Sequence, residues 1–325
     1  MNDFQSSASL EVLAFRAEVL KRTRSFFDER SFLEVQTPLL SGDTVVDRHI
    51  DPIPVLLPDD AFDLNRGRSM WLQTSPEFAM KRLLASGAEA IYQVAPAFRI
   101  GEIGEKHNTE FTVLEWYRCG DSYLDGMQLL SDFVAAILEV DAAERTTMSV
   151  AFEQMAGFNP LPCSAEELRG HCNAHELSIP DSICSDDWDS HFDILFTELV
   201  QPNLGEKTPV IIYDYPASQS ALAKLRKGTP PVAERFELFF QGIELANGYH
   251  ELLDADELLR RNNAVNQERT LDGKYELPTE SWLLSAMRSG IRPCVGVAVG
   301  FDRLVMLGSG ATSIREVLTF PTDIA

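Results

Sequence analysis

The residues Gly296-Val297-Ala298-Val299-Gly300-Phe301-Asp302-Arg303 decide the fold prediction for this chain of 325 residues. Small and β-branched residues up to Gly300 indicate a strand, and Arg303 lies where a helix is expected to begin. Glycines allow backbone to approach a ligand closely, and a helix N-terminus attracts anions. The segment therefore predicts a strand-to-helix junction suited to a polyphosphate.

A second segment complements the first. Phe98-Arg99-Ile100-Gly101-Glu102 is followed by His107-Asn108-Thr109-Glu110-Phe111 and by Leu114-Glu115-Trp116-Tyr117. An arginine at the end of a strand, before a charged loop, suits the other end of the same anion.

In this order, and with this stretch between them, the two segments resemble motifs 2 and 3 of the class II aminoacyl-tRNA synthetases. That family activates carboxylic acids with ATP. The resemblance implies that Arg99 and Arg303 are catalytic, stabilising charge on the phosphate oxygens as the substrate carboxylate attacks the α-phosphorus. It further implies that ATP is bound by Ile100, Gly101, Glu102, His107, Asn108, Phe111, Glu244, Leu245 and Gly300, together with the two arginines.

Hydrophobic periodicity predicts the surrounding elements. Amphipathic helices are expected at 9–30 and 123–140, and a helix with proline at its start at 76–85. Strands are expected at 32–38, 70–73, 90–98, 110–118, 211–213, 236–240, 243–251 and 295–299. Adjacent strand pairs with few βαβ alternations predict an α+β fold, with an antiparallel β-sheet flanked by helices.

The domain organisation follows from the same resemblance. The helix at 9–30, the strand and Pro38 resemble motif 1, which builds the dimer interface in the family, so a homodimer is expected. We expect residues 1–325 to form a single class II synthetase-like catalytic domain, with a helical acidic insertion around 159–206 and no anticodon-binding domain.

Alternation along the strand after the charged loop places Phe111, Val113, Glu115 and Tyr117 on one face. An aromatic ring, a carboxylate and a phenol on one face are suited to line a ligand-binding site. The alternative is a half-exposed strand with the Glu115 side chain in water. By resemblance, Phe111 stacks on adenine and Glu115 and Tyr117 bind the amino acid. The resemblance further implies that one amino group of the substrate amino acid is contacted by Ser75, Pro76 and Glu77.

Asn247, Tyr249 and Glu251 also share one strand face. This segment resembles the part of lysyl-tRNA synthetases that lies along the amino-acid side chain, where the glutamate receives the terminal ammonium. A buried ammonium requires a buried carboxylate, because an unpaired charge there would cost several kcal/mol. Glu251 is therefore the predicted counter-ion.

Glu237 and Glu244 lie on either side of Gln241-Gly242, a plausible hairpin turn. Their carboxylates would repel each other unless a cation lay between them, and Mg²⁺ binds one or two carboxylates together with phosphates. These positions resemble the metal-binding acids of the lysyl enzyme. Two exposed glutamates on a hairpin are the alternative.

A zinc site is the rival prediction for a group of residues in the acidic insertion. Their spacing matches no common structural zinc site, so we do not favour it. The group comprises His171, Cys172, His175, Cys184 and His191.

Composition limits the partners. The chain has 50 acidic and 28 basic residues, a formal net charge of −22, which disfavours RNA binding through phosphate contacts. Neither a signal peptide nor an apolar run long enough to cross a bilayer is apparent. Five cysteines without paired spacing are typical of reduced thiols, so we expect a cytoplasmic protein with no membrane partner.

The C-terminal half resembles a lysyl-tRNA synthetase catalytic domain, and the resemblance extends over almost the whole chain. Truncated paralogues in that family transfer (R)-β-lysine or lysine, through an acyl-adenylate, to a lysine side chain of elongation factor P. The resemblance therefore implies an ATP-dependent ligase that uses Mg²⁺ and forms an amide bond. A tRNA-charging enzyme, an asparagine-type amide-forming synthetase and a non-catalytic regulatory paralogue remain as alternatives.

Two positions depart from the family pattern. Gly101 stands where motif 2 usually has glutamate, and Glu102 follows it. Ala298 stands where motif 3 commonly has its central glycine. A methyl group there would intrude on the substrate pocket, which suits an amino acid other than ordinary α-lysine.

Overall fold

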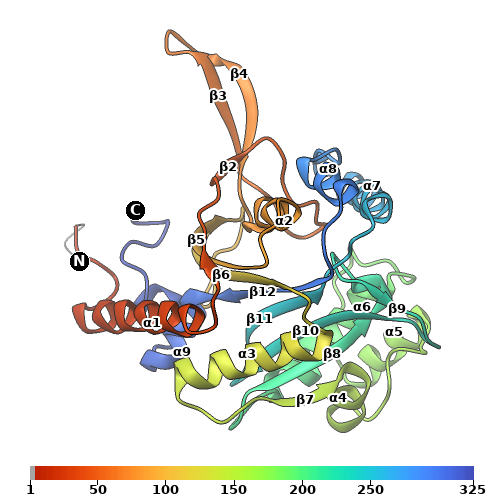
Figure 1. Cartoon of the computed structure of the whole chain (residues 1–325). Coiled ribbons are helices and arrows are strands. Elements are labelled where there is room, and N and C mark those ends of the chain that lie inside the picture. Colours follow the sequence, from red (N-terminus) through yellow and green to blue (C-terminus); the bar gives the residue numbers. More distant parts are fainter. Residues whose placement is uncertain (1–3) are drawn as a thin grey trace. The chain divides into compact units, whose positions relative to one another are not determined.

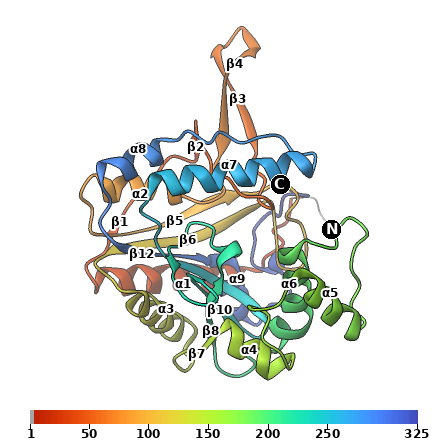
Figure 2. The same cartoon turned by 90° about the vertical axis from the view of Figure 1, so that its right-hand side faces the viewer.

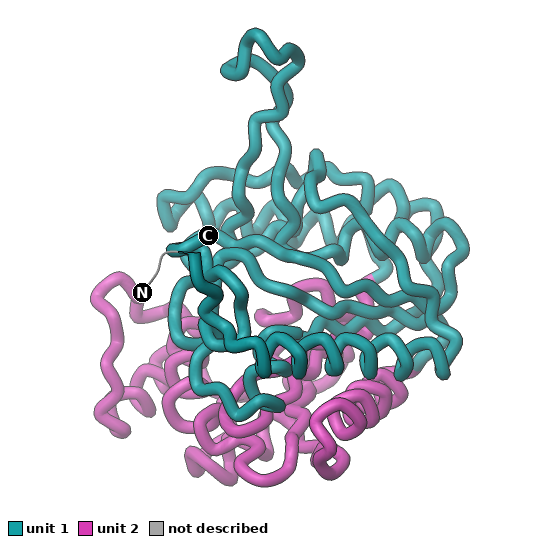
Figure 3. The backbone as a smooth tube through the Cα atoms, turned by 90° about the vertical axis from the view of Figure 1, so that its left-hand side faces the viewer, with its two compact units in different colours: residues 1–121, 253–325 teal, residues 122–252 magenta. Residues whose placement is uncertain are grey.

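The computed structural model describes residues 4–325. The chain divides into two compact units, residues 1–121 with 253–325 and residues 122–252 (Figure 3). We call them unit 1 and unit 2 and describe each by itself.

Unit 1 contains the three segments that resemble the synthetase motifs. Its helices are α1 (Leu10–Asp28), α2 (Glu77–Ala85), α7 (Ala255–Leu271), α8 (Trp282–Ser289) and α9 (Phe301–Ser309). Its strands are β1 (Leu33–Glu34), β2 (Leu40–Ser41), β3 (Pro54–Asp60), β4 (Asp63–Leu72), β5 (Ala90–Phe98), β6 (Glu110–Cys119) and β12 (Cys294–Gly300).

The central strands of unit 1 run in the order β1-β5-β6-β12. Strand β1 is parallel to β5, whereas β5 pairs with β6 and β6 with β12 in antiparallel fashion. Helices α1 and α9 lie on one face of these strands, and α2, α7 and α8 lie on the other (Figures 1 and 2).

Side-chain packing identifies the two faces. On the α1 face, Phe27 stacks on Tyr92 with ring centroids 4.5 Å apart and also contacts Trp116. On the α2 face, Met80 and Leu84 pack with Ile91, Tyr117 and Cys294. Because side chains alternate along a strand, Glu115 and Gln93 belong to the α2 face.

A smaller sheet of order β2-β4-β3 completes unit 1. Its β3–β4 hairpin extends away from the other strands of the unit (Figure 1). Only the end of this hairpin was predicted, as a strand at 70–73. The prediction at 32–38 was too long, since β1 covers only Leu33–Glu34.

Unit 2 has a second set of paired strands in the order β11-β10-β8-β7, with β9 paired to β10. The β8–β10 and β10–β11 pairs are antiparallel, and β7 is parallel to β8. The strands are β7 (Glu144–Thr147), β8 (Val210–Pro216), β9 (Leu225–Arg226), β10 (Val232–Phe240) and β11 (Ile243–His250). The helices are α3 (Tyr123–Leu138), α4 (Met148–Met155), α5 (Ala165–Ala174) and α6 (Trp188–Leu195).

The acidic segment 159–206 contains helices α5 and α6. Helices α5 and α6 are followed by a π-helical turn, Phe196–Val200, and a short 3₁₀ turn. Its apolar side chains, including Phe192 and Leu195, are buried against Ile212 of β8 and Phe239 of β10. The segment is therefore part of the core of unit 2.

The predicted fold class is confirmed by these pairings. The strand predictions at 90–98 and 110–118 correspond to β5 and β6, and the helix prediction at 9–30 corresponds to α1, with Ser9 as its N-cap. Antiparallel pairs predominate and helices flank them, which is the α+β arrangement.

Candidate active site

Strand β12 ends at Gly300, and helix α9 begins at the next residue, as the sequence predicted. Arg303 lies in the first turn of that helix, where its Nη2 donates to Nε2 of His107 at 2.6 Å. Its Nε also donates to the carbonyl of Lys106 at 3.3 Å. The arginine of motif 3 therefore meets the loop of motif 2 within unit 1.

The neutral form of His107 is favoured. Burial and the nearby Arg303 guanidinium lower the pKa of His107 below its ordinary value. Arginine has only donors, so Nε2 of His107 acts as the acceptor in this contact. The pair brings together two residues that were predicted from the sequence to bind ATP.

Arg99 follows β5 and forms the second cationic group. Its Nη1 lies 3.3 Å from Oε1 of Glu102, and its guanidinium lies over the Phe111 ring at 4.9 Å. Gly101 between them has a φ of +81°, which lets the chain reverse so that Glu102 reaches Arg99. Glu102 thus approaches the arginine even though Gly101 occupies the usual glutamate position.

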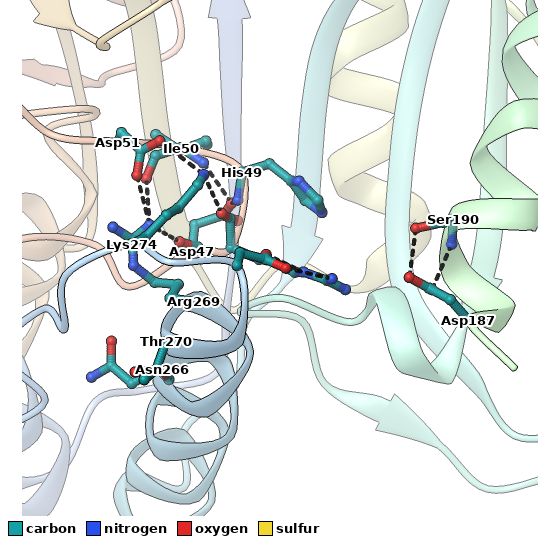
Figure 4. A network of polar contacts seen from close by, with 12 residues as sticks. Asp47, His49, Ile50, Asp51, Asp187, Ser190, Asn266, Arg269, Thr270 and Lys274 are labelled. Atoms are coloured by element: carbon teal, nitrogen blue, oxygen red, sulfur yellow. Dashed lines mark hydrogen bonds and ion pairs between the residues drawn. The ribbon is translucent and has the colours of Figure 1, made fainter. Parts of the chain in front are cut away.

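A network of ion pairs supports the start of this loop (Figure 4). The carboxylate of Asp51 forms ion pairs with Nη1 of Arg269 and with Nζ of Lys274, each at 2.8 Å. Arg269 is fully buried. The backbone carbonyl of Asp51 then accepts from the amide of Ile100 at 2.8 Å. Sequence reasoning missed Asp51 and Arg269, because nothing in the local pattern connects residues 218 positions apart.

Glu115 lies on the α2 face with two hydrogen-bond donors. Oγ of Ser75 donates to its Oε2 at 2.7 Å, and the Tyr117 hydroxyl donates to its Oε1 at 2.5 Å. The carboxyl group is buried, so the alternative of a water-exposed Glu115 is wrong. Burial, together with repulsion from Glu77, raises the pKa of Glu115 to about 7.

Glu77 already has a cationic partner. Its Oε1 lies 2.6 Å from Nζ of Lys81, one helical turn further along α2, and both side chains are buried. Pro76 is the N-cap of the helix that carries them. Sequence reasoning missed Lys81, because an (i, i+4) Glu–Lys pair is common on exposed helices.

Ala298 lies directly opposite Glu115 in the β6–β12 register. Residues opposite each other on antiparallel strands have neighbouring side chains on one face. The methyl group of Ala298 therefore lies beside the buried carboxylate, as the prediction of a substrate contact requires.

Glu237 lies in unit 2, and both of its carboxylate oxygens have partners. The Tyr215 hydroxyl donates to its Oε2 at 2.6 Å, and the half-buried Arg235 side chain pairs with its Oε1. Burial raises the pKa of Glu237, Arg235 opposes this shift, and repulsion from Glu244 adds to it. The mutual repulsion of the two glutamates fits a shared cation, although Arg235 already compensates part of the charge.

The hairpin between the two glutamates has the predicted turn. Gln241 and Gly242 both have positive φ, 52° and 70°, which is typical of a type I′ turn. Leu245, an expected ATP contact, is buried on β11 just past Glu244.

Further along β11, Nδ2 of Asn247 donates to the Tyr249 hydroxyl at 2.9 Å. Oδ1 of Asn247 is buried and accepts no hydrogen bond from residues 4–325. Glu251 follows at the end of the strand, 2% exposed. A Cβ at Gly248 would lie 2.3 Å from the Phe236 ring, so only glycine fits between them.

Other predicted residues have structural contacts. Nδ2 of Asn108 donates to the carbonyl of Glu110, and its Oδ1 accepts from the amide of Thr322. Within residues 4–325, no three His, Cys, Asp or Glu side chains are grouped so as to hold a metal ion. Cys172 instead contacts the carbonyl of His191, and His171 stacks on Phe158.

Two basic residues of unit 2, Lys224 and Arg226, have acidic neighbours. Arg226 pairs with Asp214 and lies 3.9 Å from Glu234, and Lys224 lies 4.0 Å from Glu234. No helix in the described part of the chain, residues 4–325, is long and apolar enough to cross a membrane.

Comparison with known proteins agrees with this geometry. The family model of the class II tRNA synthetases (D, K and N) matches residues 1–324. The elongation factor P–(R)-β-lysine ligase of Vibrio vulnificus is 43% identical, with 99% of each chain covered. The proteins of the same name from Vibrio cholerae and Pasteurella multocida are 41% and 38% identical, with at least 98% of each chain covered. The chain therefore belongs to the class II tRNA synthetases (D, K and N) and, within them, to the family of the elongation factor P–(R)-β-lysine ligases.

Proposed function

We propose that this protein is an ATP-dependent ligase that activates (R)-β-lysine as an acyl-adenylate and transfers it to a lysine side chain of elongation factor P. The observation that carries the proposal is the full-length similarity to ligases of that name. The buried carboxylate of Glu115 supports it, because such a group suits a substrate that brings an ammonium.

The first step joins the substrate carboxylate to the α-phosphorus of ATP and breaks its bond to pyrophosphate. Arg99 and Arg303 bind the phosphates and stabilise the charge that develops on their oxygens. Phe111 offers a ring face to adenine. No protein nucleophile is required in this step.

Glu237 and Glu244 would hold Mg²⁺, which supplies positive charge to the phosphate oxygens when bound. The mutual repulsion of their carboxyl groups supports this assignment. At the amino-acid end, Ser75, Glu77, Glu115 and Tyr117 bind one amino group, and Asn247, Tyr249 and Glu251 bind the terminal one.

The second step is attack by the acceptor lysine amine on the adenylate carbonyl, which forms an amide and releases AMP. We further propose a cytoplasmic homodimer that uses a protein acceptor and not RNA. The net charge of −22 and the ion pairing of Lys224 and Arg226 support a non-RNA acceptor.

The test is pyrophosphate exchange with (R)-β-lysine, (S)-β-lysine and α-lysine in parallel. Incubation with purified elongation factor P should then increase the mass of that protein by one β-lysyl group. Exchange without any mass increase, together with charging of tRNA, would replace the proposal by the tRNA-charging alternative. Absence of exchange with every amino acid would favour a non-catalytic paralogue.

A further inference from the structure

Gln93 carries a buried polar group that lacks a partner. The residue lies in β5 and is 3% exposed. Its Oε1 is inaccessible to solvent and accepts no hydrogen bond from any residue between 4 and 325. The great majority of buried polar side-chain atoms are partnered, and leaving one unpartnered costs stability. The free amide oxygen therefore needs an explanation.

The strand register places Gln93 beside Glu115, in the proposed amino-acid site. Gln93 lies opposite Glu115 on β6, and Glu115 lies opposite Ala298 on β12. The three side chains form one row across three strands of unit 1, because opposite residues share a face. Ile91, two residues earlier on the same face, packs against Met80 of α2, which confirms the orientation.

The missing partner of Gln93 must be a donor, because a carboxamide oxygen only accepts hydrogen bonds. The neighbouring side chains that carry donors each have another acceptor. Ser75 and Tyr117 donate to Glu115, and Nζ of Lys81 lies 2.6 Å from Glu77. A ligand that brings its own N–H groups next to a carboxylate would satisfy both Gln93 and Glu115. A primary ammonium has this chemistry.

We propose that Gln93 is a substrate-binding residue whose carboxamide oxygen accepts a hydrogen bond from the amino group nearest the reacting carboxylate of the diamino acid. This inference rests on the proposed function. The position of the row supports the choice of amino group. Ala298 lies two residues before Gly300, and the helix that carries Arg303 begins directly after Gly300.

The test is Gln93→Met, which removes the amide and preserves the length of the side chain. In pyrophosphate exchange, the KM for (R)-β-lysine should rise about tenfold or more, since the lost hydrogen bond is to a charged donor. The KM for ATP should stay within about twofold. The melting temperature should be unchanged or higher, because a buried group without a partner has been removed.

A substrate analogue identifies the amino group. 6-Aminohexanoic acid lacks the amino group nearest the carboxylate and retains the terminal one. Its inhibition constant against (R)-β-lysine exchange should be the same for the wild type and Gln93→Met. Equal losses for β-lysine and for this analogue would overturn the assignment to that amino group.

Gln73 offers a matched control in the same unit. It is also a buried glutamine, 7% exposed, but its Nε2 donates to the carbonyl of Pro96 at 2.9 Å. Gln73→Met should therefore lower the melting temperature. If Gln93→Met lowers it equally and leaves the KM for β-lysine at the wild-type value, Gln93 has a structural role only. A wild-type protein that activates no diamino acid would instead count against the proposed function itself.

Discussion

Nη1 of Arg16 lies 2.6 Å from Oδ1 of Asp302, so helix α1 is tied to the residue that precedes Arg303. Thr112 of β6 forms hydrogen bonds with both residues. Its amide donates to Oδ2 of Asp302 at 2.7 Å, and its hydroxyl accepts from Nη2 of Arg16 at 2.8 Å. One buried carboxylate thus connects the three segments that resemble motifs 1, 2 and 3.

Arg16→Met should destabilise the protein by roughly 3 kcal/mol, because it leaves the charge of Asp302 buried without its cation. Urea unfolding measures this loss. Arg24→Met on the same helix is the control, since Arg24 and Glu34 form an exposed pair whose removal should cost less than about 1 kcal/mol. Equal losses in the two variants would show that Asp302 does not depend on Arg16.

Arg303→Ala should reduce pyrophosphate exchange by at least about tenfold, since each 1.36 kcal/mol of lost transition-state stabilisation is a factor of ten. The same result is expected for Arg99→Ala. Arg292, an exposed arginine paired with Glu89, provides a control variant that should retain exchange. Exchange within about threefold of wild type for Arg303→Ala would make the motif 3 assignment wrong.

Glu251→Gln should impair lysine-like substrates far more than ATP. A neutral amide cannot balance a desolvated ammonium, and the expected cost is a few kcal/mol. The KM and kcat for (R)-β-lysine, measured beside the KM for ATP, test this. Unchanged values for the diamino acid would assign the counter-ion to another residue.

Glu115→Gln should change the pH dependence of stability. The native carboxyl retains its proton up to about pH 7, whereas the unfolded one loses it near the ordinary value of 4.5. Native Glu115 therefore binds more protons between these values, and its contribution to stability falls as the pH rises through this window. Glutamine has no such titration.

Between pH 4.5 and pH 8, the unfolding free energy of Glu115→Gln should consequently rise relative to wild type by up to roughly 3 kcal/mol, at 1.36 kcal/mol per pKa unit. Losses of hydrogen bonds from Ser75 and Tyr117 do not depend on pH and cancel in this comparison. Unfolding curves that differ by the same amount at both pH values would contradict a raised pKa.

Ala298→Gly should raise kcat/KM for α-lysine relative to (R)-β-lysine. The methyl group lies beside Glu115, and a methyl in a tight pocket shifts selectivity by about 1–3 kcal/mol. α-Lysine carries its amino group next to the reacting carboxylate, where removal of the methyl gives it room. Pyrophosphate exchange with both amino acids measures the ratio. Equal changes for both would show that Ala298 affects general packing.

The sequence predicted the elements that have strong local patterns. Alternation and a charged loop identified β5 and β6, and the order of motifs identified the family. The β3–β4 hairpin was largely missed, because Pro54 and Pro58 argue against a strand and most of its side chains are exposed. An exposed strand has no apolar face from which its period can be recognised.

By itself, the sequence determined the α+β fold and the strand face that carries Glu115, because these depend on periodicity and on neighbours along the chain. Only the tertiary structure decided that Gln93 lies opposite Glu115, that Lys81 neutralises Glu77 in a buried site, and that Asp51 holds Arg269. These relationships depend on strand register, on burial and on contacts between distant segments. They arise because packing removes water from polar and charged groups that are hydrated in the unfolded chain.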